Sequence, residues 1–296
     1  MNRNHLVPRA VVAAVLFLAI GCGGVTTEIT VSEHNAETLA TAGLDAVRMI
    51  EDVSGMIDRF SESFFDPAQR LVLCDTGDVA ISVNDVGAEG LSTGDDANVD
   101  FNACVVALDD GPLTLDGSLY LRAEDITGDP SGAFTREVYA SFDAATVVFL
   151  DATVVIDGGI TASLSSPDGV TFVADISGDS FSALAQEGDR VFSGSLSDFH
   201  GEGRLDTSAD TYSVEFEATV YTDDLGGSAH FETTVPFTGA VDEYPSAGTF
   251  VATGANGATV TLVAIDNVNV QILIDEDGDG TPSTIDTTWE VLGNIP

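Results

Sequence analysis

The residues best suited to chemistry form one acidic run near the C-terminus, DEDGDGTPSTID over residues 275–286. Carboxylates stand at positions 1, 3, 5 and 12 of this run, and a glycine stands at position 6. This is the spacing with which oxygen ligands surround a calcium ion, the ligand at position 7 being a backbone carbonyl. The expected ligands are Asp275, Asp277, Asp279, Thr281 and Asp286.

The run differs from a helix-flanked calcium loop in two respects. Strand-like segments, 268–274 and 287–292, flank it, and position 12 is Asp, whose side chain is shorter than that of Glu. We therefore expect a hairpin turn that binds calcium with modest affinity and serves stability, the alternative being a solvated turn without metal. A second acidic turn over residues 84–96 is a weaker calcium candidate.

Residues for catalysis are sparse. His34, His200 and His230 are too far apart in sequence for a local zinc motif, and the chain has no HExxH and no phosphate-binding glycine loop. We expect no enzymatic activity. The alternative is an envelope hydrolase that uses scattered acidic residues.

The N-terminus has the layout of a bacterial lipoprotein signal. Arg3 and Arg9 precede an apolar run over residues 11–20 that is too short to span a bilayer. The following sequence, LAIGC, resembles a lipobox, in which the cysteine receives diacylglycerol and acyl chains such as palmitate. We expect cleavage after residue 21 and lipidation of Cys22. Because Gly23 rather than Asp follows, we expect the outer membrane, with the protein facing the periplasm or the cell surface.

Two further cysteines, Cys74 and Cys104, would remain in an oxidising compartment, where a disulfide is the default. The alternation of apolar residues places both thiols on the polar face of neighbouring strands. Closing a loop of about 30 residues would stabilise the fold by roughly 3–4 kcal/mol. Free thiols with a metal or redox role are the alternative, but no CxxC supports them.

The strongly negative charge of the chain argues against nucleic acid and anionic lipid head groups as partners. The chain has 49 acidic residues against 9 arginines, and two of those arginines lie in the signal, so the mature charge is 7 minus 49, or −42. Such a surface repels nucleic acid and anionic head groups and favours cations or basic partners. Adaptation to a saline habitat is the alternative explanation.

The elements that must position these residues are one helix and many strands. After a tether over residues 22–34, apolar residues at 3–4 spacing predict an amphipathic helix over 35–62, with Asn35 as its N-cap. From 70 to 296 the pattern alternates with period two, and turn residues interrupt it every 8–14 residues. Residues 180–189 are the least regular part and are expected to form a loop.

We count about twelve to fourteen strands, too many for a flat open sheet. The predicted fold is mainly β: a large curled antiparallel meander, as a half-barrel, barrel or sandwich, with the N-terminal helix packed on it. Trp289 is expected on the final strand as a core residue.

Several short motifs carry a resemblance to a known group. These include GLSTGD at 90–95, FNAC at 101–104, YPSAG at 244–248 and the acidic hairpin up to TTW at 287–289. Together they resemble uncharacterised β-rich proteobacterial lipoproteins with a lipobox and an acidic C-terminal hairpin. The resemblance implies an extended β fold and no catalytic residues.

The expected function is therefore that of an envelope lipoprotein of structural or binding type. It would hold an apolar ligand, or an envelope protein, on a curled β-sheet and be anchored to the membrane by its lipid. A surface adhesin is a further alternative.

Overall fold

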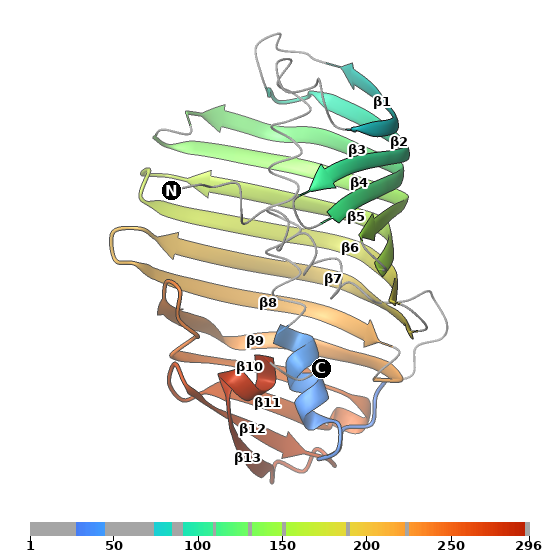
Figure 1. The fold of residues 1–296 in the computed structure, drawn as a ribbon. Helices are drawn as coiled ribbons and strands as arrows, with labels where there is room; N and C mark the ends of the chain where they lie inside the picture. The colour runs from blue at the N-terminus through green and yellow to red at the C-terminus, as the bar shows by residue number, and fades with distance from the viewer. Residues whose placement is uncertain are drawn as a thin grey trace.

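The chain forms a single long antiparallel sheet in the computed structural model (Figure 1). The structure describes residues 28–44, 74–84, 91–108, 111–129, 132–149, 152–187, 190–222 and 225–293. The strands are β1 (Thr76–Asn84), β2 (Asp96–Leu108), β3 (Gly111–Gly128), β4 (Phe134–Phe149), β5 (Ala152–Ser166), β6 (Thr171–Glu187), β7 (Arg190–Asp206), β8 (Thr211–Thr222), β9 (Gly227–Ala240), β10 (Ala247–Thr253), β11 (Thr259–Ala264), β12 (Asn269–Asp275) and β13 (Ser283–Thr288). Each strand pairs only with its neighbours in the chain.

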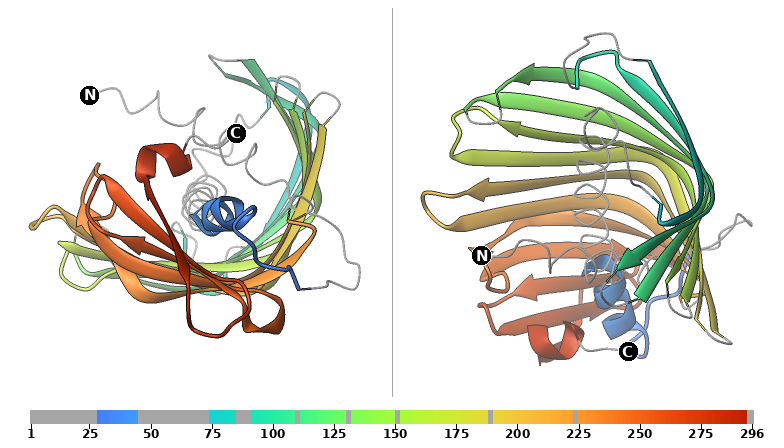
Figure 2. Two further views of the ribbon diagram at one scale, coloured as in Figure 1. Left: turned by 90° about the horizontal axis from the view of Figure 1, so that it is seen from below. Right: turned by 45° about the horizontal axis from the view of Figure 1, so that its top comes forward.

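The predicted meander is confirmed, and its 13 strands fall within the expected number. The sheet is open, with β1 and β13 as its edges. The closed barrel and the two-sheet sandwich are therefore wrong, whereas the curl is correct (Figure 2). Closure needs first and last strands that can pair, and here β1 and β13 lie at opposite ends of the meander.

The curl comes from bends aligned across the middle of the sheet. Ala103, Ala144 and Asp198 have positive φ angles of 46°, 46° and 50°, and each lies at a register shift in its strand. An extra residue on one strand bends that strand and increases its twist. Gly117 and Gly158 supply positive φ at the matching places in β3 and β5. Neighbouring strands thus bend together, and we call this line the crease (Figure 2).

The N-terminal helix packs inside the curl, as expected (Figure 2). It begins at residue 36, directly after Asn35, and is described as far as residue 44. Leu39 is fully buried, and a side chain on Gly43 would lie only 2.8 Å from Phe250 and 2.9 Å from Phe231. Glycine therefore allows the helix to approach β9 and β10 closely. The predicted remainder of the helix, up to residue 62, lies outside the described residues.

Two elements differ from expectation. Residues 180–187 belong to β6, which pairs with both β5 and β7, so the loop predicted there is wrong. Backbone pairing and the buried ring of Phe181 hold this weakly patterned segment in the sheet. Trp289 begins the short helix α3 (Trp289–Gly293) rather than lying on a strand, but it is a core residue, as predicted. No helix within the described ranges has the length and apolar content to cross a bilayer.

Candidate functional site

A groove of about 860 Å³ crosses strands β4 to β7 at the crease. Each of the four strands contributes one aspartate to its lining: Asp143, Asp157, Asp179 and Asp198. All four are exposed. Hydroxyl groups from Tyr139, Ser141, Thr161, Ser177 and Ser180 complete the polar part of the lining.

The groove opens on the polar face of the sheet. In β4 the side chains of Val138, Ala140 and Phe142 are buried in the core. Since successive side chains of a strand point to opposite faces, Tyr139 and Ser141 face away from the core. The groove therefore lies on one face of the curled sheet, and the N-terminal helix packs against the other face.

Glycines make room for the groove. A Cβ atom on Gly159 would lie 2.7 Å from the Tyr139 hydroxyl oxygen, and one on Gly178 would lie 2.5 Å from Cζ of Phe199. Contacts this short are not tolerated, so both aromatic rings occupy space that any larger residue would fill. The floor of the groove is therefore backbone and aromatic ring, and its walls carry carboxylates.

The register brings like charges together. Gly178 pairs with Phe199 and Ser180 with Ser197, which places Asp179 opposite Asp198. At the bulge in β4, the amide of Ala144 donates a hydrogen bond to Oδ2 of Asp157, at 3.3 Å. No arginine is among the described residues that line the groove. Because like charges opposite each other destabilise a sheet, the groove favours a cation or a basic group.

A histidine and an aspartate lie beside the groove. His200 pairs with Ser177 across β6 and β7, and its Nδ1 lies 3.6 Å from Oδ2 of Asp175. Burial raises the pKa of Asp175, against the opposing effect of His200, and Glu202 raises it further. Within the described strands no hydrogen bond joins His200 to Ser177, so the three residues do not form a hydrogen-bonded triad.

The structure brings together three of the five residues expected to bind calcium. Carboxylate oxygens of Asp275, Asp277 and Asp279 lie within 4.8 Å of one another. Asp275 accepts the amide of Gly280 at 2.8 Å, and Asp279 accepts the amide of Thr281 at 2.8 Å. The three aspartates could therefore hold a small cation from one side of the turn.

The structure does not bring the fifth expected ligand to this cluster. Asp286 lies on β13 opposite Gln271, whose side-chain amide donates to it at 2.9 Å. It lies three residues along the strand from Ser283, where the hairpin ends, a span of roughly 10 Å. Glu276, also in the turn, accepts the amide of Glu33 at 2.7 Å and ties the turn to the segment before the helix.

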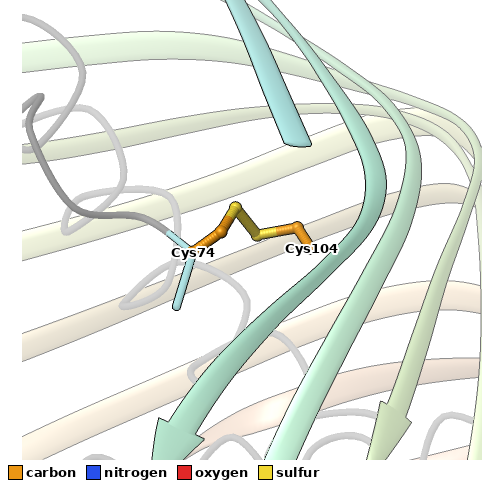
Figure 3. The surroundings of a disulfide bond; sticks show 2 residues. All are labelled: Cys74 and Cys104. Atoms are coloured by element: carbon orange, nitrogen blue, oxygen red, sulfur yellow. A yellow bond between two sulfur atoms is a disulfide. The ribbon is translucent and has the colours of Figure 1, made fainter. Parts of the chain in front are cut away.

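The predicted disulfide between Cys74 and Cys104 is present (Figure 3). However, Cys104 is fully buried on the core face, so its expected place on the polar face is wrong. The bulge at Ala103 adds one residue between Phe101 and Cys104, and both of these then point into the core. Cys22, the expected lipidation site, lies outside the described residues.

Sequence reasoning did not find the groove. Its aspartates come from four strands, and none forms a local motif with the others. The available signal was glycine beside aspartate within strand patterns, as in DGG at 157–159 and GDS at 178–180, since glycine inside a strand marks a bulge or a close approach. Comparison of the chain with protein-family models, curated proteins and solved structures finds no match.

Proposed function

We propose that this protein is a lipid-anchored envelope lipoprotein of binding type, whose groove at the crease holds a basic segment of an envelope partner. The observation that carries the proposal is the groove itself, with one carboxylate from each of four adjacent strands and no arginine in its described lining. The lipobox at Cys22 and the residue after it support an anchor in the outer membrane. The short motifs given above support a place among β-rich proteobacterial lipoproteins.

A basic partner explains the groove better than an apolar ligand. The concave face, where an apolar ligand would lie, is covered at β9 and β10 by the protein's own helix, whose Gly43 lies against Phe231 and Phe250. Leu39 on that helix and Phe231, Leu262 and Ile272 on the sheet are all fully buried. The groove instead combines negative charge with hydroxyl groups that accept and donate hydrogen bonds.

A binding role also fits the groove better than hydrolysis. The candidate acid–base pair, His200 and Asp175, is separated by 3.6 Å and has no hydrogen-bonded nucleophile in the described strands. General acid–base catalysis needs its groups within hydrogen-bond reach of the reacting atoms. The groove carboxylates therefore serve recognition in this proposal.

The test measures binding of a fluorescent oligoarginine peptide to the chain by anisotropy, with Asp157→Asn combined with Asp179→Asn. We expect this double variant to bind at least tenfold more weakly. The control combines Asp116→Asn with Asp125→Asn, exposed residues outside the groove that change the net charge equally. If the control weakens binding as much as the groove variant does, the peptide senses only the overall charge and the proposal fails.

We also propose that the turn carrying Asp275, Asp277 and Asp279 binds calcium in a structural role. The convergence of three carboxylates supports this, and oxygen ligands are those that calcium prefers. With three carboxylates gathered among the described residues, water would complete the coordination, which favours modest affinity.

A further inference from the structure

The first strand leaves one edge of the sheet open. Among the described residues, no segment pairs with the outer side of β1, and its nine residues form one edge of the 13-stranded sheet. An edge strand presents unpaired N–H and C=O groups that can pair with another chain. The edge is therefore a surface for adding a strand.

β1 carries few of the usual protections of an edge, and those it has lie at its start. The strand has no proline and no basic residue, and its one charge, Asp78, lies near its start, next to its one register shift. Val79, Ile81 and Val83 are half-buried against the core cluster, whereas Ala80 and Ser82 are exposed. An added strand with apolar residues at alternate positions would extend the core by one row.

We propose that β1 pairs antiparallel with β1 of a second copy of this chain, with Ile81 opposite Ile81 on the two-fold axis. This register places Val79 opposite Val83 and Ala80 opposite Ser82. Directly opposite residues of an antiparallel pair share a face, so the side chains of Val79, Ile81 and Val83 all fall on the core side. The strand is thus complementary to itself.

The same register keeps the carboxylates of the two paired β1 strands apart. Asp78 falls opposite Asn84 of the second copy, so no two carboxylates on β1 face each other. An amide opposite a carboxylate can donate a hydrogen bond to it. The whole chains still repel, since each has a formal charge of −40. Salt should therefore strengthen the pairing.

The other edge is less suited to pairing. β13 has six residues, and its one apolar side chain is Ile285, which is also half-buried against the core. Pairing at β13 would bury one apolar side chain from each copy, compared with three at β1. Ile285 thus provides a matched control for Ile81.

Single cysteines on β1 test the register. In a chain carrying Cys22→Ala, the introduced thiol is the only one outside the Cys74–Cys104 disulfide. Paired residues in an antiparallel sheet have Cα atoms about 4.5–5.5 Å apart, within disulfide range. Ile81→Cys should therefore form a covalent dimer under mild oxidation. Neither Val79→Cys nor Val83→Cys should form a covalent dimer by itself. A mixture of the two variants should form one, because residue 79 of one copy lies opposite residue 83 of the other.

Sedimentation of the Cys22→Ala chain gives an independent measurement. We expect a dimer whose dissociation constant falls at least tenfold between 0.05 and 0.5 M NaCl. Ile81→Lys should raise that constant at least tenfold, and Ile285→Lys should change it less than twofold. A monomer at all concentrations and salts, or cross-linking of Val79→Cys alone as efficient as that of Ile81→Cys, would overturn the proposal.

Discussion

Many aspartates of this chain hold backbone turns. Asp168, Asp206 and Asp266 each lie at the end of a strand or just after it. Each accepts hydrogen bonds from the amides of the residues two and three places further on, at 2.7–2.9 Å. Such turns are the local structure that Asp favours. Part of the acidity is therefore structural, and only part is available for recognition.

Because of these turns, the stability of the folded protein depends on pH. The hydrogen bonds lower the pKa of Asp168, Asp206 and Asp266: chiefly the Thr171 amide at Asp168, the Ser208 hydroxyl at Asp206 and the Asn269 side chain at Asp266. A lowered folded-state pKa gives stability that is present above the ordinary value of 3.8 and lost as the pH falls through the folded value.

We expect the melting temperature to fall as the pH drops below about 4. The triple variant Asp168→Asn, Asp206→Asn, Asp266→Asn should show a shallower fall, because Asn keeps an acceptor oxygen and does not titrate. Thermal unfolding followed by circular dichroism from pH 7 to pH 2 checks this. Equal slopes for the two proteins would show that other carboxyl groups dominate acid unfolding.

The calcium turn has its own test at the residue scale. Calcium should raise the midpoint of thermal unfolding by several degrees relative to EDTA, because an ion that binds only the folded state stabilises it. Asp277→Ala with Asp279→Ala should lose this response. Asp286→Ala should retain it, since Asp286 lies on β13 with Gln271 as its partner. A response unchanged in the double variant would place the calcium elsewhere.

At the scale of elements, the bulges decide which face each residue joins. A bulge shifts the two-residue period by one, so residues on its two sides obey different alternations. The bulge at Ala103 therefore puts Cys104 in the core. The same irregularities in β4 and β7 lie beside Asp143 and Asp198, which line the groove.

The glycines of the crease should be intolerant of side chains. Gly178→Ala would place Cβ 2.5 Å from Phe199 and should destabilise the protein by about 1–3 kcal/mol through overpacking. Gly203→Ala, in β7, is the matched control, because no atom lies within 4 Å of its Cβ position. Urea unfolding of both variants checks this. The same Cβ would also lie 2.6 Å from the backbone oxygen of Gly159. If Gly178→Ala is no less stable than Gly203→Ala, both the Phe199 ring and this carbonyl group are free to move aside.

At the scale of the whole molecule, charge opposes the compact fold. The chain has 49 acidic residues and only nine arginines, and the resulting formal net charge of −40 on 296 residues causes repulsion within the folded protein. The described ion pairs between Arg122 and Glu124 and between Arg204 and Glu202 are exposed and local. Stability should therefore depend on the salt around the protein.

We expect the melting temperature to rise as NaCl increases from 0.05 to 1 M, since the screening length shortens from more than 10 Å to about 3 Å. Thermal unfolding is measured in NaCl and in an equal concentration of a neutral osmolyte such as sucrose. The comparison separates the screening of charges by salt from the stabilisation that any solute excluded from the protein surface produces. If the osmolyte produces the same rise, charge repulsion is not what limits the stability of this fold.

The amino-acid sequence by itself determined the fold class, the number of strands, the start of the helix and the disulfide partners. These follow from local periodicity, from turn residues and from the pairing of the two cysteines that follow Cys22. The gathering of Asp275, Asp277 and Asp279 was also predictable, because all three lie in one turn.

Only the tertiary structure decided that the sheet stays open, where it bends and which face Cys104 joins. These depend on register shifts between strands, which leave little trace in the pattern of either strand alone. The groove arises for the same reason: Asp143, Asp157, Asp179 and Asp198 meet because four bent strands lie side by side, and no local spacing brings them together.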